Sequence, residues 1–223
     1  MAESIDVISE GLLARLVAVA LIAACACTAP RQQPPTDSRP SADAKACTPP
    51  SAARLDIELV GQGSDQLCWA AVTQMLGAWS GHPVTQCELV KARHPECECV
   101  ACLASASLPE SGCNEGGWPD FERVGLKAMR TIDQPLPHAV IKDEIGCQHR
   151  PVVFGWHTAP GPGAGHMMVA YGYDRDLIQI LEPWPPCQGQ TRAITYDEYV
   201  NGNDPGTSNH WHDFFRITPR AAR

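Results

Sequence analysis

Apolar side chains stand on nearly every side of a helix drawn through residues 69–79, which read WAAVTQMLGAW. A helix that is apolar all round lies buried in the core of a protein. The pattern therefore predicts a buried central helix inside a helical segment at residues 64–80. A second helix is predicted at residues 119–129, because a proline follows Trp118 in the way that prolines occupy the first turn of helices.

The C-terminal half of the chain instead carries short runs of β-branched and aromatic residues separated by turns, a pattern typical of strands. A brief helical turn is expected at residues 196–199, before the last strand. Helices that precede a run of strands indicate an α+β fold with a helical half and an antiparallel β half. We expect the active site in a cleft between these halves. The expected strands are residues 151–157, 166–173, 177–181, 191–195 and 212–218.

Two of these strands, 166–173 and 177–181, are joined by the short polar stretch DRD, which predicts a β-hairpin centred near residue 175. In such a hairpin, residues whose numbers add to about 350 lie opposite each other. His166 at the start of the first strand and Glu182 at the end of the second would then be near cross-strand neighbours. A register shift of one residue would put them on opposite faces of the sheet.

Cys68 opens the predicted buried helix, and Gln62 precedes it in the run QGSDQLCWAA. Ser64 or Asp65 can cap the helix, so the thiol would lie in the first turn, where unpaired backbone N–H groups and the helix dipole favour a thiolate. The amide of Gln62 can donate a hydrogen bond to the oxygen of an attacked carbonyl, the oxyanion role. Taken alone, this segment equally allows an inert cysteine in the core.

A cysteine nucleophile needs an imidazole base, and that imidazole needs a partner to orient it. His166 and Glu182 follow Cys68 in the order and geometry that supply both. This pattern favours Cys68 as a nucleophile over a core cysteine. His157 is a weaker candidate for the base, because no acidic residue follows it at strand spacing.

These motifs together resemble the papain-like cysteine peptidases, in particular their bacterial C39-like branch. The resemblance rests on the block QGSDQLCWAA, on the pair GH before an apolar strand, and on the tripeptide EPW, and it extends over residues 55–218. It implies a papain-like fold in which Cys68 is the nucleophile, His166 the general base and acid, and Gln62 the oxyanion donor. The expected reaction is cleavage of a peptide or protein substrate through a thioester acyl-enzyme.

Glu182 departs from the family pattern, which has Asn or Asp at the position that orients the imidazole. Glutamate is one methylene longer, so the departure leaves open a catalytically silent domain that binds peptides. Transglutamination or deamidation is a second alternative, because these acyl transfers use the same nucleophile and base.

The first 53 residues add an export signal and a linker to this domain. Residues 15–25 form an apolar stretch too short to span a bilayer, and it ends in IAAC, which resembles a bacterial lipoprotein signal with Cys25 as the lipidated residue. Acidic residues upstream depart from the usual basic start, so an ordinary secretory signal or a cytosolic protein remains an alternative. Residues 26–53 are rich in proline and small polar residues and predict a disordered tether, which leaves residues 54–219 as the peptidase domain. We expect a lipid-anchored protein of the cell envelope, facing the periplasm or on the cell surface.

The charge of the chain limits its partners. A formal net charge of −8 and a pI near 5.4 provide no basic surface for nucleic acid. The glycine-rich stretch at residues 161–165 lacks the lysine and the following helix of a phosphate-binding loop. We therefore expect no nucleic acid, cofactor or metal.

Eleven cysteines in a chain with an export signal predict disulfides in an oxidising compartment. We expect at least two bridges, with Cys68 left free and Cys147 paired with Cys187, because these two flank strands expected to be neighbours. The alternative is a zinc site, since three cysteines at positions 97, 99 and 102 stand near His94. The cysteines expected to form bridges are Cys87, Cys97, Cys99, Cys102, Cys113, Cys147 and Cys187.

Overall fold

The computed structural model describes residues 47–97, 112–158, 165–202 and 208–221, which all belong to the unit Lys45–Arg223. The predicted signal sequence with Cys25 and most of the predicted tether lie outside the described residues. No helix within the described ranges is long and apolar enough to cross a membrane.

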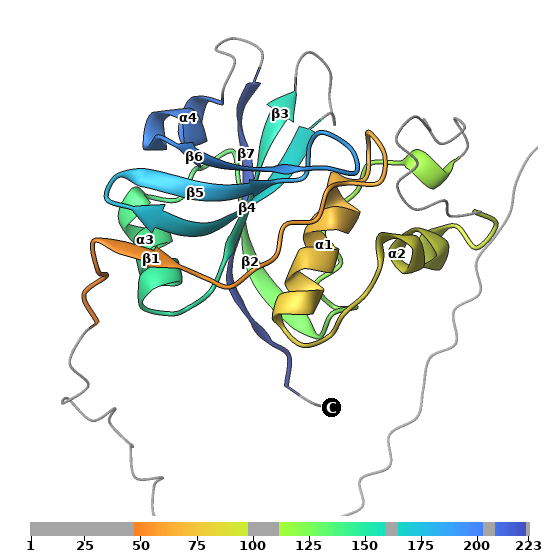
Figure 1. Cartoon of the computed structure of the whole chain (residues 1–223), viewed down its shortest axis with the longest axis horizontal. Coiled ribbons are helices and arrows are strands. Elements are labelled where there is room, and N and C mark those ends of the chain that lie inside the picture. The colour runs from red at the N-terminus through yellow and green to blue at the C-terminus, as the bar shows by residue number, and fades with distance from the viewer. Residues whose placement is uncertain (1–46, 98–111, 159–164, 203–207, 222–223) are drawn as a thin grey trace, which may run out of the picture. The chain divides into compact units, whose positions relative to one another are not determined.

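An antiparallel sheet of seven strands forms the centre of this unit (Figure 1). Six strands run in the order β2-β7-β3-β4-β5-β6, and β1 pairs with β4. The five predicted strands and the helical turn before the last strand are confirmed, with bounds that differ by a few residues at the ends. The strands are β1 Ala52–Arg54, β2 Leu126–Ile132, β3 Val152–Thr158, β4 Gly165–Asp174, β5 Leu177–Glu182, β6 Gln190–Ile194 and β7 Ser208–Pro219. The helices are α1 Cys68–Trp79, α2 Gln86–Arg93, α3 His138–Gly146 and α4 Tyr196–Asn201, with a 3₁₀ turn at Gly112–Asn114.

Helix α1 is the buried central helix that the apolar pattern predicts. Nine of its twelve residues are buried, and it packs against β4 and α2. Cys68 is its first residue, as expected for a thiol in the first turn. The predicted cap is wrong: the N-cap is Leu67, whose side chain makes no capping bond. The Ser64 carbonyl instead accepts the Leu67 N–H at 3.1 Å and closes a turn just before the helix.

The predicted helix at residues 119–129 is wrong. The local signal produces one turn, in which the Asp120 carboxylate accepts the Arg123 N–H at 3.2 Å. Gly125 then takes φ = +67° and ends the turn, with the Leu126 N–H bonded to the Phe121 carbonyl at 2.8 Å. The residues that follow form the edge strand β2, because β7 pairs with them along the strand, with one irregularity between Lys127 and Met129.

Helices α2 and α3 and strand β1 were not predicted at all. Helix α2 begins with a capping box, in which the Thr85 hydroxyl accepts the Glu88 N–H and the Glu88 carboxylate accepts the Thr85 N–H. Helix α3 and the short strand β1 lie together against β4. Both were missed because α3 has no side-chain cap at its start and β1 is only three residues long.

The hairpin of β4 and β5 is confirmed, and it fixes the register near the candidate site. Val169 lies opposite Leu181 and Ala170 opposite Ile180, so that paired numbers add to 350 at this end of the hairpin. A bulge between Ala170 and Gly172 shifts the pairing by one residue nearer the turn. His166 and Glu182 follow the unshifted part, which leaves them diagonal neighbours on adjacent strands.

Disulfides are present, but the predicted pair Cys147–Cys187 is wrong. Cys147 pairs with Cys47, and Cys187 is a free thiol. Strand β4 lies between β3 and β5, so the cysteines that flank those two strands are not brought together. Cys147 instead ends α3 beside Pro50, where the start of the domain passes.

A second bridge joins Cys97 to Cys113 and ties the end of the α2 region to the 3₁₀ turn. Cys87 is also disulfide-bonded, and Cys68 is free, as predicted. Because Cys97 is in a disulfide, it cannot be a thiolate ligand of the zinc site considered above. Cys99 and Cys102 lie outside the described residues.

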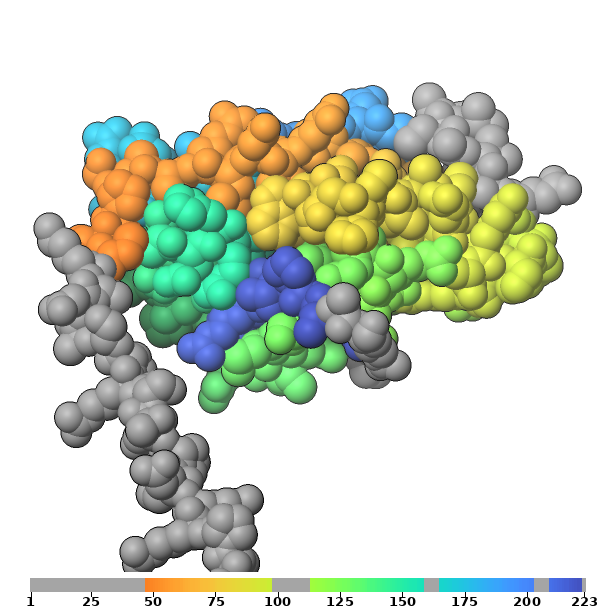
Figure 2. Space-filling view, turned by 90° about the horizontal axis from the view of Figure 1, so that it is seen from below, coloured from red at the N-terminus to blue at the C-terminus, as the bar shows by residue number. Residues whose placement is uncertain are grey.

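The space-filling view in Figure 2 shows strand β2 in green and the end of β7 in blue exposed together on one face, with α3 beside them. Two apolar side chains of β2, Met129 and Ile132, are 49% and 60% exposed. Strand β2 is thus an exposed edge of the sheet. Strands β4 and β5, which carry His166 and Glu182, have neighbouring strands on both sides.

Candidate active site

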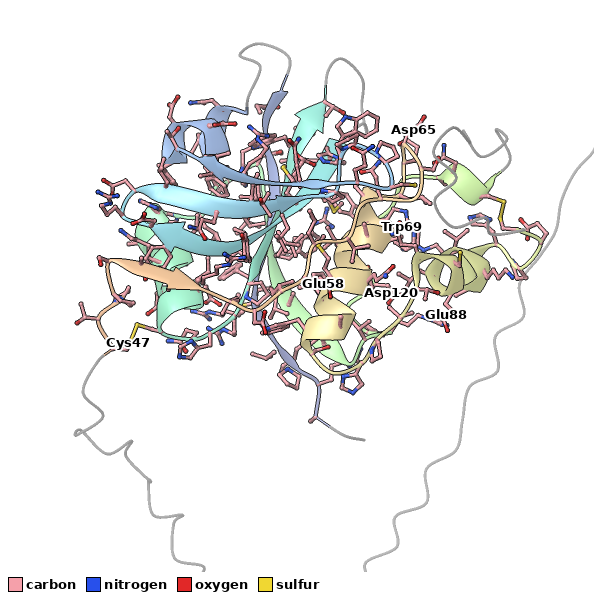
Figure 3. All side chains as sticks on the ribbon, in the orientation of Figure 1. Cys47, Glu58, Asp65, Trp69, Glu88 and Asp120 are labelled. Atoms are coloured by element: carbon pink, nitrogen blue, oxygen red, sulfur yellow. A yellow bond between two sulfur atoms is a disulfide. The ribbon has the colours of Figure 1, made fainter. Side chains whose placement is uncertain are left out.

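The first turn of α1 places Cys68 in the interior of the domain, where it is 5% exposed. Figure 3 labels a residue before and a residue after Cys68 in the chain: Asp65 lies in the loop before the helix, and Trp69 lies in its first turn. The backbone N–H groups at the start of a helix have no acceptor within the helix, and no side chain caps them here. They leave partial positive charge at the end of the helix that carries the thiol.

His166 lies between Cys68 and Glu182. Its Nε2 atom is hydrogen-bonded to the Oε1 atom of Glu182, which leaves Nδ1 for the sulfur. The imidazole is 18% exposed and the carboxylate 6% exposed, so this contact is shielded from water. The cross-strand arrangement expected from the hairpin therefore brings the histidine and the acid into direct contact.

The surroundings of His166 favour its charged form. Burial lowers the pKa of the imidazole, but hydrogen bonds to the Cys68 sulfur and the Glu182 carboxylate, together with the negative charge of both groups, raise the pKa of His166 to about 10. At neutral pH the ring is thus an imidazolium. This positive ring is hydrogen-bonded to the Cys68 sulfur.

Glu182 is oriented by more than the histidine. Its Oε1 atom also accepts the Trp184 N–H at 3.1 Å, and its Oε2 atom lies 3.8 Å from Nη1 of Arg192 on β6. Arg192 also pairs with Glu198 of α4. The carboxylate is therefore held from three sides. Sequence reasoning missed Arg192, because β6 meets β5 only through the sheet and no local pattern links the arginine to Glu182.

Gln62 is fully buried just before α1, but its amide is already engaged. The Nε2 atom donates to the Ser64 carbonyl at 2.7 Å and to the Asp65 carbonyl at 2.9 Å. The Oε1 atom has no hydrogen-bond partner. An oxyanion would have to compete with one of these two carbonyls for an amide hydrogen, so the oxyanion role of Gln62 stays a prediction.

The other histidines have different surroundings. His157 stacks on Trp211 with ring centroids 4.6 Å apart and has Nε2 3.5 Å from Asp133. His210 bonds to the buried Asp213 at 2.9 Å. The contacts of His157 are with Trp211 and Asp133 and do not involve the Cys68 thiol, so His166 remains the candidate for the base. In the part of the chain that the structure describes, no group of His, Cys, Asp and Glu side chains could hold a metal ion.

Comparison with known proteins identifies the family of the chain and a similar structure. A family model described as papain-like cysteine protease AvrRpt2, of the peptidase family C70, matches residues 51–204. The fold is similar to the peptidase domain of Streptococcus ComA, a bifunctional ABC transporter involved in a quorum-sensing pathway, with 13% sequence identity, 74% of this chain and 99% of that chain covered, and a TM-score of 0.42. No curated protein matches the sequence.

Proposed function

Because the chain belongs to the family of papain-like cysteine proteases and is a papain-like cysteine peptidase, we propose that Cys68, His166 and Glu182 are its catalytic triad. The observation that carries the proposal is the position of His166, whose ring has hydrogen bonds to both the thiol and the carboxylate. We further propose that the peptide substrate binds in a cleft between the helical half and the sheet. The family match identifies an enzyme, so the silent peptide-binding alternative is set aside.

The reaction follows from the charges of this triad. The Cys68 thiolate attacks the carbonyl carbon of the scissile bond, and the electron pair of the C=O bond moves to its oxygen. The His166 imidazolium gives its proton to the leaving amine, the C–N bond breaks, and a thioester remains on the sulfur. Neutral His166 then takes a proton from water, whose oxygen attacks the thioester. The C–S bond breaks, the acid product leaves, and the thiolate–imidazolium pair is restored.

In this scheme Glu182 holds the ring and favours its charged form. An amide at this position can still orient a ring nitrogen, but it carries no negative charge. The longer side chain of glutamate is accommodated because the carboxylate stands at the end of β5, where the Trp184 N–H and Arg192 also reach it. We therefore infer that Glu182 acts through its negative charge as well as through the orientation that it gives to the ring.

The pH dependence of Glu182→Gln tests the proposal. The folded-state pKa of His166 lies above its ordinary value, so the imidazolium is favoured at neutral pH and is lost as the pH rises through about 10. Cleavage of a fluorogenic peptide library should therefore fall on the alkaline side near that pH. Removing the negative charge in Glu182→Gln should move this alkaline limb down by about 1–3 pH units, with a smaller loss of rate than in His166→Ala.

Two outcomes would contradict the proposal. An alkaline limb at the same pH in both proteins would remove Glu182 from the triad. A wild-type protein that incorporates amines or deamidates glutamine, but cleaves no peptide, would assign the same residues to acyl transfer and not to hydrolysis. Glu198→Gln is the matched control, because Glu198 pairs with the same arginine, Arg192, but is not hydrogen-bonded to the His166 ring.

We propose that the enzyme is exported and held in the cell envelope by a lipid on Cys25. The disulfides Cys47–Cys147 and Cys97–Cys113 support an oxidising compartment. Mass spectrometry of the membrane fraction should find an acylated cysteine at position 25 as the first residue, and Cys25→Ala should lose the acyl group and leave the membrane. A mature protein that keeps residues upstream of Cys25 would refute the anchor.

A further inference from the structure

The backbone on both sides of Gln62 is held by one side chain, that of Gln86. Its Nε2 atom donates to the Gly61 carbonyl at 2.9 Å. Its Oε1 atom accepts the Gly63 N–H at 2.8 Å. One amide thus supplies a donor and an acceptor to the two peptide groups that flank Gln62, in the way that a neighbouring strand would.

Gln86 is itself fixed to the helix that carries the nucleophile. It is the first residue of α2, and its own N–H donates to the Gln74 side chain of α1 at 3.1 Å. The next residue, Cys87, is disulfide-bonded. The capping box at Thr85 further stabilises this end of α2. Gln86 therefore links α1 to the segment that contains Gln62 through a rigid helix start.

The opposite side of Gln62 is closed by the loop that follows Glu182. The Gln62 N–H donates to the Pro183 carbonyl at 3.0 Å, and its carbonyl accepts the Cys187 N–H at 2.8 Å. A Cβ atom at Gly61 would lie 2.5 Å from the Gln188 nitrogen, so the two backbones touch here. The segment 61–63 is thus clamped between this loop and Gln86.

The side chain of Gln62 depends on this clamp, since its own contacts are few. Its Oε1 atom is buried without a hydrogen-bond partner, and its Nε2 atom contacts only the Ser64 and Asp65 carbonyls of the same loop. No side chain of another element is hydrogen-bonded to the Gln62 amide within the described residues. Its direction therefore follows from the backbone at 61–63.

We propose that Gln86 is a positioning residue, which places the Gln62 amide against the carbonyl oxygen of the substrate as the tetrahedral intermediate forms. The proposal rests on the peptidase function proposed above and on the oxyanion role that the sequence predicts for Gln62. A donor displaced by about 1 Å can lower the rate by about 10²-fold. Gln86→Met keeps the length of the side chain but removes both hydrogen bonds, and it should lower kcat by about 10–10²-fold with little change in KM.

A double-mutant cycle on the full-length protein separates the possible outcomes. Gln62→Ala alone should lower kcat by about 10²–10³-fold. If Gln86 acts through Gln62, the double variant Gln62→Ala, Gln86→Met should have the kcat of Gln62→Ala. Alkylation of Cys68 by iodoacetamide forms no oxyanion, so its rate should stay the same in all three variants.

Thr85→Ala is the matched control, because it removes the capping box of the same helix and leaves both bonds of Gln86 to the backbone. It should lower the melting temperature and keep kcat. An unchanged kcat in Gln62→Ala would overturn the oxyanion role itself. A normal kcat in Gln86→Met, or a loss that multiplies with that of Gln62→Ala, would overturn the positioning role while leaving Gln62 as the donor. A fall in kcat that Thr85→Ala reproduces would also overturn it.

Discussion

His166→Ala should lower kcat/KM for peptide cleavage by at least about 10³-fold, because it removes both the general base and the cation beside the sulfur. In the wild-type protein the imidazolium lies between Cys68 and Glu182, with the pKa of His166 raised to about 10. The positive ring should therefore speed the alkylation of the Cys68 sulfur. Alkylation of Cys68 near pH 6 should lose this advantage in the variant and fall to the rate of the thiol in the denatured protein.

The free thiol of Cys187 provides an internal comparison for this experiment. Cys187 is the other free cysteine of the described residues. Peptide mapping after a short alkylation pulse should find Cys68 modified well before Cys187 in the wild-type protein, and no such order in His166→Ala. Equal rates for the two cysteines in the wild-type protein, with no turnover of peptide, ester or amine substrates, would contradict the proposed mechanism. His157→Ala should leave the order unchanged.

Removing the bridge between Cys47 and Cys147 should lower the free energy of unfolding by about 3–5 kcal/mol. The two cysteines are 100 residues apart, and a crosslink over so long a loop strongly restricts the unfolded chain. The double variant Cys47→Ser, Cys147→Ser avoids a stray thiol. For a domain of this size the loss corresponds to a melting temperature lower by about 6–20 °C, measured by thermal and urea unfolding.

Cys187→Ser is the control for this prediction, because it removes a thiol that forms no bridge. It should change the free energy of unfolding by less than about 1 kcal/mol. The urea m-value should rise in the double variant only, since its unfolded chain exposes more surface. An unchanged stability of the double variant, or a peptide map that pairs Cys147 with Cys187, would show that the Cys47–Cys147 bridge does not form.

The placement of the site could be predicted from the sequence where the signals are local. The apolar stretch at 69–79 predicts the buried helix and puts Cys68 at its start. The turn near residue 175 fixes the register of one hairpin, and that register brings His166 to Glu182. Each inference depends on helix or strand periodicity and on a single turn. These inferences agree with the order of the papain-like motifs, and together they indicate the papain-like cysteine peptidases.

The prediction of a helix at 119–129 is wrong, because a tertiary contact outweighs the local signal there. Proline and Asp120 do produce a turn, but a helix needs several more residues to become stable, and Gly125 ends it. Pairing with β7 then decides that the next residues form β2. This partner lies about 90 residues away along the chain, so no window of local sequence contains it.

The buried helix that begins at Cys68, the hairpin and the presence of disulfides could be predicted from the chain alone, because they follow from periodicity, turn chemistry and composition. Three contacts became known only from the folded structure: the pairing of Cys147 with Cys47, the position of Arg192 beside Glu182, and the hold of Gln86 on the backbone around Gln62. These contacts join residues far apart in the chain, and they depend on the order of strands in the sheet and on how α2 packs against α1. No local sequence pattern predicts hydrogen bonds of this kind, so they are known only from the folded structure.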